Sequence, residues 1–225
     1  MNQVKRILLL VGSAKQTIST SELIGTYLIE RLQSNGYETE TLFAHKLLKS
    51  NSWERLLSST DRADIIVIAF PLFVDCLPYS VIKSLEQIAG HRQAKSELKE
   101  QTLVCLANCG FPEQHHNDTA IAICRQFARE AGFKWAGALS LGGGEAIGGQ
   151  PLFKIKRTTK NVMKALDLTA EAIALGHPVP QEAIDSMAKP MVPKWIYLLM
   201  GGWGWKRRAK KNRVLKTILH RPYEG

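Results

Sequence analysis

Short apolar segments, each closed by a turn signal, constrain the fold of this chain more than any other feature. Segments of this length that are apolar throughout are typical of strands buried on both faces of a parallel sheet. The apolar segments are residues 4–11, 64–70 and 102–107. Residues 37–43 alternate between polar and apolar residues and predict a more exposed strand, and residues 133–141 are predicted as the fifth strand.

Apolar residues at helical spacing separate these strands, and Gly36, Gly132 and Gly176 close three of the helices. The order is a strand and then a helix, repeated five times. Such alternation predicts an α/β protein with a doubly wound, five-stranded parallel sheet. Five units fit the flavodoxin-like strand order 2-1-3-4-5, in which ligands bind beyond the carboxyl ends of the strands. The helical segments are residues 23–32, 53–58, 81–88, 120–128 and 162–173.

Composition places the chain among ordinary globular proteins, with 45% hydrophobic and 22% charged residues in a length of 225. The apolar run at residues 7–11 is too short for a secretory signal, and no run reaches the roughly 18 residues of a membrane span. The four cysteines form no CxxC pair, so we expect reduced thiols and a cytoplasmic location.

The positive charge is concentrated in the C-terminal segment. Residues 1–185 hold 20 basic and 19 acidic residues, whereas residues 186–225 hold 10 basic residues and one acidic residue. The Pro-rich segment 177–180 predicts a boundary between a domain at residues 1–176 and a basic, Trp-containing extension at residues 177–225. We favour packing of the extension's aromatic residues on the domain or on a partner subunit. Contact with an anionic membrane surface is the alternative, and no nucleic-acid-binding signature is present.

Two loops at the expected ligand edge admit two interpretations each. Residues 12–21 combine hydroxyl groups, Lys15 and the start of a helix, which suits either a phosphate or a simple N-cap at Ser19 or Thr20. In the loop after the third strand, Phe73 either offers a flat wall to a ring or fills the core, and the residue type alone favours the core.

Two further loops follow the fourth and fifth strands. Residues 108–117 contain Gly110 and a pair of histidines, for which a structural or cofactor-edge role is favoured and no metal site is expected. Cys109 has no partners in sequence that indicate a nucleophile. The glycine-rich residues 142–149 either cover a ligand, contribute to a partner's site, or form a flexible loop.

These motifs resemble the NAD(P)H-dependent FMN reductases of the flavodoxin-like group, and the resemblance spans nearly the whole chain. Its elements are Gly12-Ser13-x-Lys15, Ser19-Thr20-Ser21, Pro71-Leu72-Phe73-x-Asp75-x-x-Pro78 and Asn108-Cys109-Gly110-Phe111-Pro112. Residues 127–137 and the closing Arg221-Pro-Tyr-Glu resemble the larger, tailed members. The family loop usually has proline, arginine and asparagine where this chain has Ala14, Lys15 and Thr20, and often tyrosine in place of Phe73.

The resemblance implies an FMN-dependent oxidoreductase that takes electrons from NADPH or NADH and passes them to a small acceptor, such as a quinone, an azo or nitro compound, a flavin or a metal complex. It also implies a homodimer, and the cofactor rather than a side chain would carry the chemistry. The FMN phosphate would be held by Ser13, Lys15, Ser19, Thr20 and Ser21. The ring would be lined by Pro71, Leu72, Phe73 and Val74, and its pyrimidine edge would lie near Asn108, Cys109 and Gly110.

Two rival functions remain on sequence grounds. The first is a non-catalytic flavodoxin-like binding module that uses its basic tail on a membrane surface or nucleic acid. The second is an electron carrier of the flavodoxin kind, which ranks lower because the nearly neutral domain lacks an acidic docking surface.

Overall fold

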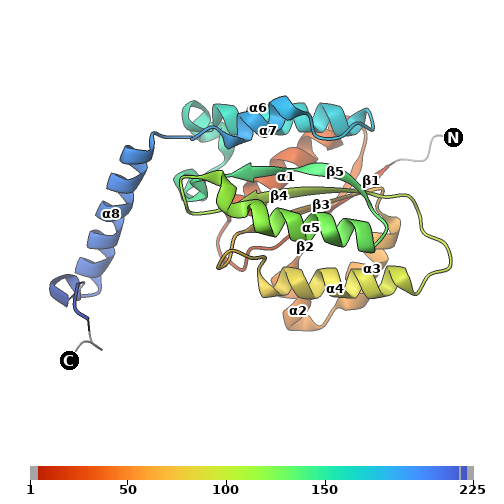
Figure 1. Ribbon diagram of the computed structural model, residues 1–225, viewed down its shortest axis with the longest axis horizontal. Coiled ribbons are helices and arrows are strands. Elements are labelled where there is room, and N and C mark those ends of the chain that lie inside the picture. Colours follow the sequence, from red (N-terminus) through yellow and green to blue (C-terminus); the bar gives the residue numbers. More distant parts are fainter. Residues whose placement is uncertain (1–4, 218, 222–225) are drawn as a thin grey trace. The chain divides into compact units, whose positions relative to one another are not determined.

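A computed structural model describes residues 5–217 and 219–221 of the chain. Its centre is a five-stranded parallel sheet in the order β2-β1-β3-β4-β5, which confirms the predicted strand order and fold class (Figure 1). Val4, the predicted start of the first strand, lies outside the described residues. The strands are β1 (Arg6–Val11), β2 (Glu38–Phe43), β3 (Ile65–Pro71), β4 (Thr102–Asn108) and β5 (Lys134–Leu141).

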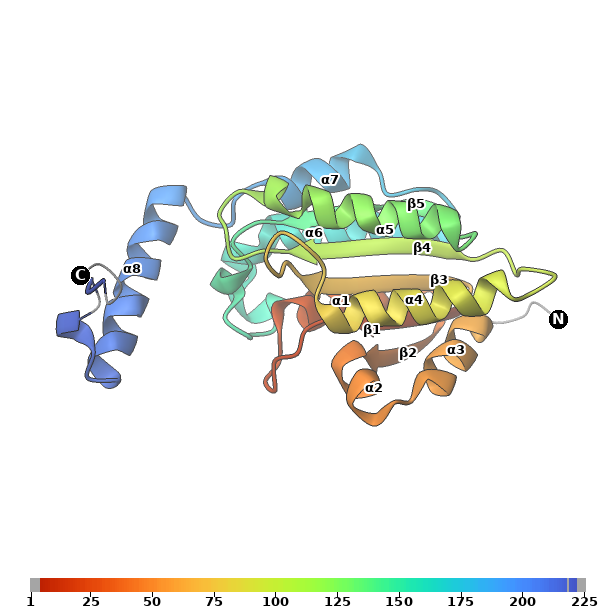
Figure 2. The same ribbon diagram turned by 60° about the horizontal axis from the view of Figure 1, so that its bottom comes forward.

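Helices cover both faces of the sheet, and this explains why the central strands β1, β3 and β4 are apolar without alternation. Along β1, Leu9 packs with the cluster beneath α1, α6 and α7, whereas Leu8 and Leu10 pack with the cluster beneath α2 to α5 (Figures 1 and 2). Both faces are therefore dry, as expected for a parallel sheet. These helices are α1 (Thr20–Gln33), α2 (Ala44–Ser50), α3 (Trp53–Arg62), α4 (Tyr79–Gln93), α5 (Asp118–Glu130), α6 (Lys156–Ala174) and α7 (Gln181–Ala188).

The register of the sheet brings the carboxyl ends of its central strands to one edge. Val11 pairs with Ala69, and Pro71 pairs with Asn108. The pairing continues one step past each strand, because the Gly12 N–H donates to the Ala69 carbonyl at 2.8 Å and the Leu72 N–H to the Asn108 carbonyl at 2.7 Å. The loops that follow β1, β3 and β4 therefore start from fixed, neighbouring positions.

The structure differs from the predicted organisation in two places. A helix, α2, follows β2 directly, and the prediction missed it because its seven residues are too few to show a clear period. The compact domain continues to Met191, beyond the predicted boundary at residue 176. The reason is α7, whose residues Ala183 and Met187 are buried in the core, while the Val179 N–H donates to the Ala136 carbonyl at 2.7 Å.

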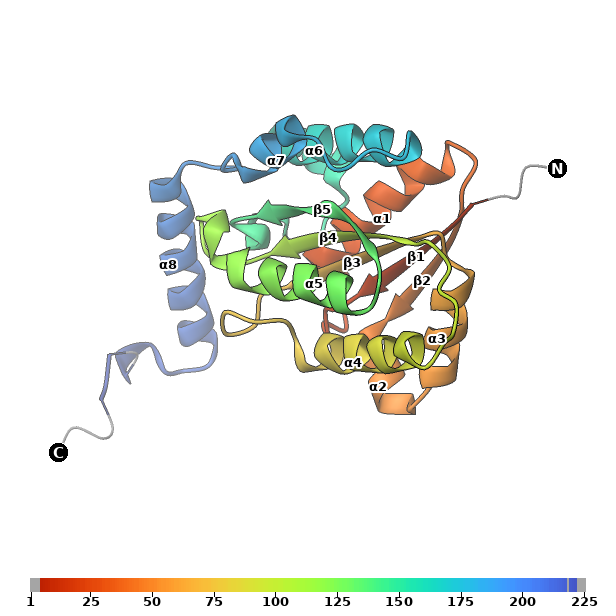
Figure 3. The ribbon, with the colours of Figure 1, turned by 45° about the vertical axis from the view of Figure 1, so that its right-hand side comes forward.

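The described residues from Val192 onward form a separate unit. It contains the continuous 18-residue helix α8 (Lys194–Lys211) and a short turn of 3-10 helix, η4 (Leu215–Thr217) (Figure 3). Ala209 is the buried residue of α8, and the side chains of Trp195, Trp203 and Trp205 are exposed. The expectation that these aromatic residues pack on the domain or on a partner subunit stays a prediction.

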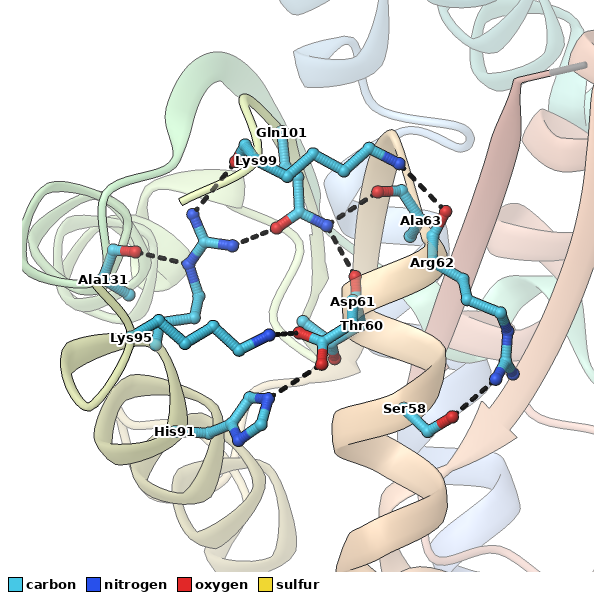
Figure 4. Close-up of polar contacts among 11 residues, drawn as sticks. Ser58, Thr60, Asp61, Arg62, Ala63, His91, Lys95, Lys99, Gln101 and Ala131 are labelled. Carbon is cyan, nitrogen blue, oxygen red and sulfur yellow. Dashed lines mark hydrogen bonds and ion pairs between the residues drawn. The ribbon is translucent and has the colours of Figure 1, made fainter. Parts of the chain in front are cut away.

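At the opposite, amino-terminal edge of the sheet, a buried arginine joins four elements. Arg92 is 2% exposed and donates to the carbonyls of Ala131, at 2.6 Å, and Gly132, at 3.0 Å. It also donates to the Gln101 side chain, which in turn donates to the carbonyls of Thr60 and Ala63 (Figure 4). The ends of α3, α4 and α5 and the start of β4 are thereby held together far from the ligand edge.

Replacing Arg92 with methionine should lower the free energy of unfolding by about 3 kcal/mol, because carbonyl groups and the Gln101 amide would lose their buried partner. Urea unfolding followed by circular dichroism measures the change. Arg62→Met is the matched control, since Arg62 is half exposed and its ion pair with Glu40 should contribute less than about 1 kcal/mol. Equal losses for the two variants would contradict the role given to Arg92.

Candidate functional site

A cleft of about 410 Å³ lies beside the carboxyl ends of β1, β3 and β4. It includes every predicted binding residue except Val74, and it adds Ala14 and Glu145, which the prediction did not include. The lining comes from four loops that are far apart in sequence. Its members are Ser13, Ala14, Lys15, Ser19, Thr20, Ser21, Pro71, Leu72, Phe73, Asn108, Cys109, Gly110 and Glu145.

The start of α1 forms one part of the cleft. The Ser19 hydroxyl accepts the Glu22 N–H at 3.1 Å, and the Glu22 carboxylate accepts the Ser19 N–H at 3.4 Å, which is a capping box. The N-cap interpretation of Ser19 is therefore confirmed. The geometry of a helix leaves the N–H groups of Thr20 and Ser21 without intrahelical acceptors, so the positive end of α1 remains directed at the cleft.

The hydroxyl groups around this helix end fall into two kinds. Those of Ser13, Ser19 and Ser21 accept hydrogen bonds from within the protein, from the Lys15 N–H, the Glu22 N–H and the Asn108 amide. A hydroxyl that accepts in this way keeps its proton for donation to a ligand. Thr20 behaves differently, because its hydroxyl donates to the Gly144 carbonyl at 2.9 Å. Thr20 thus holds the glycine-rich loop against α1.

An ion pair crosses the cleft at this end. The Lys15 ammonium lies 3.3 Å from the Glu145 carboxylate, and both side chains are more than half exposed. Glu145 is the second residue of the short 3-10 helix η2 (Gly144–Ile147), which belongs to the loop after β5. The positive charge predicted to meet a phosphate is therefore already paired within the chain.

The loop after β3 has a strained backbone. Phe73 and Cys76 exchange backbone hydrogen bonds of 2.8 and 3.2 Å, and the two residues between them, Val74 and Asp75, have φ values of 51° and 57°. Positive φ at both central positions is the geometry of a type I′ turn, which normally takes asparagine and glycine. A β-branched residue such as Val74 is a genuine outlier there.

This turn leaves large apolar side chains in the open. Phe73 is 65% exposed and Val74 is 91% exposed. The expectation that Phe73 fills the core is therefore wrong, because the turn directs the chain outward at this point. Phe73 lines the cleft with Pro71 and Leu72, and Val74 stands at the tip of the turn outside it.

The residues after β4 are held by the fold itself. The Asn108 amide donates to the Ser21 hydroxyl at 2.7 Å and to the Phe70 carbonyl at 3.0 Å, which connects β4 to α1 and β3. Cys109 is buried, its thiol lies 3.5 Å from the carbonyls of Phe111 and Glu113, and burial raises the pKa of that thiol. A thiol with a raised pKa stays protonated near neutral pH, so Cys109 is not an activated nucleophile.

The glycine-rich loop after β5 is anchored rather than loose. The Gly143 N–H donates to the Phe111 carbonyl at 2.6 Å, and the Gly144 N–H donates to the Cys109 carbonyl at 2.8 Å. Gly143 has a φ of 65°, which a glycine adopts without strain. These bonds fix Glu145 at the rim of the cleft. Among the described residues, no three His, Cys, Asp or Glu side chains gather as metal ligands.

No family model and no curated protein matches this chain. Solved structures do match. An NAD(P)H:quinone oxidoreductase from Methanothermobacter marburgensis shares 14% identity, over 76% of this chain and 96% of that one, with a TM-score of 0.56. An FMN-dependent NADH-azoreductase from Bacillus anthracis shares 12% sequence identity with this chain, over 76% of this chain and 100% of that one, with a TM-score of 0.52. An NADH:FMN oxidoreductase shares 13% sequence identity, over 84% of this chain and 97% of that one, with a TM-score of 0.54.

This chain has the flavodoxin-like fold. The strand order and these structural matches agree on that point. In a flavodoxin-like fold the crevice for a ligand lies at the switch point between β1 and β3. The cleft occupies that place, and its lining comes from the loops after both strands. Sequence reasoning missed Glu145 because its contact with Lys15 joins residues 130 positions apart, and no local pattern signals such a pair.

Val74→Asn should raise the free energy of unfolding by about 1 kcal/mol, because asparagine tolerates the left-handed backbone that strains valine. Urea unfolding of the whole chain measures the change. Ile18→Asn serves as the control, since Ile18 is an exposed loop residue outside the set with positive φ and should change stability by less than about 0.5 kcal/mol. A destabilised Val74→Asn variant would show that the turn is not strained by its side chain.

Proposed function

We propose that this protein is an FMN-dependent oxidoreductase that takes electrons from NADPH or NADH and passes them to a small acceptor. The single observation that carries the proposal is the composition of the cleft. It joins hydroxyl groups at a helix N-terminus to an exposed aromatic side chain, at the edge of the sheet where this fold binds ligands. FMN has a phosphate and a flat aromatic ring, and these two features require those two kinds of surface.

The phosphate side of the proposal rests on the loop after β1. The hydroxyls of Ser13, Ser19 and Ser21 keep their protons, and the start of α1 adds backbone N–H groups with partial positive charge. Lys15 supplies a full charge once it leaves Glu145. The contribution of Thr20 is to position the glycine-rich loop rather than to donate its hydroxyl proton to the ligand.

The ring side of the proposal rests on the loops after β3 and β4. Pro71, Leu72 and Phe73 give an apolar wall, and the strain at Val74 is typical of loops that hold a ligand. The backbone of Asn108 and Gly110 runs along the same cleft. Gly110 has space around it, because a Cβ built there meets no atom within 4 Å, so the chain can approach a ring edge closely.

The chemistry would come from the cofactor, which when bound accepts hydride from a reduced nicotinamide and transfers electrons onward. The residues of the chain bind it, orient it and exclude water from one side of it. We assign no side chain as an acid or base, since Cys109 is protonated and buried. The structural matches include oxidoreductases described as acting with quinones, azo compounds and FMN, and this supports an acceptor that is a small molecule.

A homodimer is part of the proposal. Large apolar side chains remain exposed near the cleft, and surfaces of this kind are commonly covered by a second subunit. They are Phe73, Val74, Tyr79 and Phe111.

The purified protein should retain FMN after excess cofactor is removed, and the flavin absorbance should bleach when NADH or NADPH is added anaerobically. The nicotinamide that bleaches it faster is the donor. Retained flavin that neither nicotinamide bleaches would instead indicate an electron carrier. Complete loss of FMN on washing would contradict the proposal, provided that circular dichroism shows a folded protein.

Glu145→Gln should tighten FMN binding about two- to fivefold, because it frees Lys15 and removes a carboxylate that repels the phosphate. Lys15→Gln should weaken FMN binding by a similar factor. Riboflavin lacks the phosphate, so neither variant should change its affinity. Fluorescence titration of both flavins measures these constants.

Phe73→Ala is the matched control, since loss of the aromatic wall should weaken FMN and riboflavin alike. Equal effects of Lys15→Gln on the two flavins would place the phosphate elsewhere.

A further inference from the structure

Within its own unit, helix α8 leaves an unusual amount of apolar surface uncovered. The side chains of its three tryptophans, Trp195, Trp203 and Trp205, are 65%, 82% and 68% exposed. Trp195, Leu199 and Trp203 follow each other at four-residue spacing, so they lie on one face of the helix. Exposed apolar surface of this extent marks a binding site for a partner or a membrane. The other large apolar residues exposed on α8 are Leu198 and Met200.

The ends of this apolar segment carry the residue types that bilayer interfaces favour. Lys194 and Trp195 open it, and Trp203, Trp205 and Lys206 close it. Its residues 195–205 span about 16 Å at 1.5 Å per residue, roughly half of a bilayer's hydrocarbon core. None of the described helices is long and apolar enough to cross a membrane. A segment with tryptophan and lysine at both ends is suited to lie within the interface rather than to span it.

The charged residues that follow this apolar segment in the sequence, as far as Arg221, are all basic. Eight Lys and Arg residues lie between Lys206 and Arg221, and no Asp or Glu occurs anywhere in residues 192–221. Residues 1–191 hold 21 basic and 19 acidic residues, so the asymmetry belongs to this segment alone. Clusters of four to eight basic residues beside an interfacial helix are attracted to anionic lipid headgroups.

We propose that residues 194–221 bind the surface of a bilayer that contains anionic lipids. The face formed by Trp195, Leu199 and Trp203 enters the headgroup region, and the basic residues after Lys206 meet lipid phosphates. Charge alone would suit nucleic acid equally well. The exposed aliphatic side chains of Leu198, Leu199 and Met200 favour the membrane over nucleic acid. Their transfer from water into acyl chains is favourable in free energy, whereas a phosphate backbone offers them no apolar contact.

The experiment uses the full-length chain and sedimented vesicles, either of phosphatidylcholine alone or with about one third phosphatidylglycerol. The protein should sediment with the anionic vesicles at least tenfold more strongly than with the neutral ones, and raised salt should weaken the binding. Tryptophan emission should shift to the blue on binding as the residues of α8 leave water. Absence of binding, or equal binding to both vesicles, would overturn the proposal.

Two pairs of substitutions separate the apolar contribution from the charged one. Trp203→Ser with Trp205→Ser, and Lys206→Glu with Lys210→Glu, should each lower anionic vesicle binding about tenfold or more. The controls are Phe153→Ser, another exposed aromatic residue, and Lys49→Glu with Arg129→Glu, which change the charge equally on the main domain. Both controls should bind as the unchanged protein does.

Two results would assign the segment to another partner. Tight binding of RNA that survives the tryptophan substitutions, without vesicle binding, would show a nucleic-acid site. A dimer in light scattering that the tryptophan substitutions dissociate, again without vesicle binding, would show a subunit interface. Circular dichroism reports the folding of every variant, so this test is independent of whether FMN binds.

Discussion

Parallel pairing of strands that are dry on both faces is the constraint on which the rest of this structure depends. Parallel strands need helical crossovers, and the crossovers bury both faces of the sheet. The same pairing sets Pro71 beside Asn108, so the loops after β3 and β4 leave the sheet together. The Asn108 side chain then joins α1 to this edge through Ser21. The cleft is thus a consequence of sheet register, and its polar lining is positioned by residues that serve the fold.

The amino-terminal and carboxyl-terminal edges of the sheet differ in structure. The amino-terminal edge is fixed by Arg92, whose guanidinium donates to two carbonyls at the end of α5 and to the Gln101 side chain, which in turn donates to carbonyls at the end of α3. The carboxyl-terminal edge carries a strained turn, an exposed aromatic residue and an exposed ion pair. The buried hydrogen bonds of Arg92 thus lie at the edge without the cleft, and the strained backbone lies at the edge with it. This separation is common in proteins whose binding loops are carried by a rigid scaffold.

Much of the fold was predictable from sequence, because continuous apolar strands and helical spacing are local signals. The residues of the cleft were also predictable once the strand order was known, since the order assigns their loops to one edge. The backbone conformation, the exposure and the hydrogen-bond partners of those residues were not predictable. The sequence Val74-Asp75 contains no glycine to signal a turn with positive φ, so the exposure of Phe73 could not be foreseen. The bond from Thr20 to Gly144 and the extension of the domain through α7 are likewise long-range contacts without a local pattern.

The Lys15–Glu145 pair has a consequence for how the cleft responds to ionic strength. A bare lysine gathers solution anions, and a charged ligand must displace them, so its affinity falls steeply as salt rises. Here the chain supplies its own anion. In the FMN complex proposed above, a phosphate at Lys15 would take the place of the Glu145 carboxylate. One ion pair would be exchanged for another, so we expect the affinity for an anionic ligand to depend less on salt than it would at an unpaired lysine.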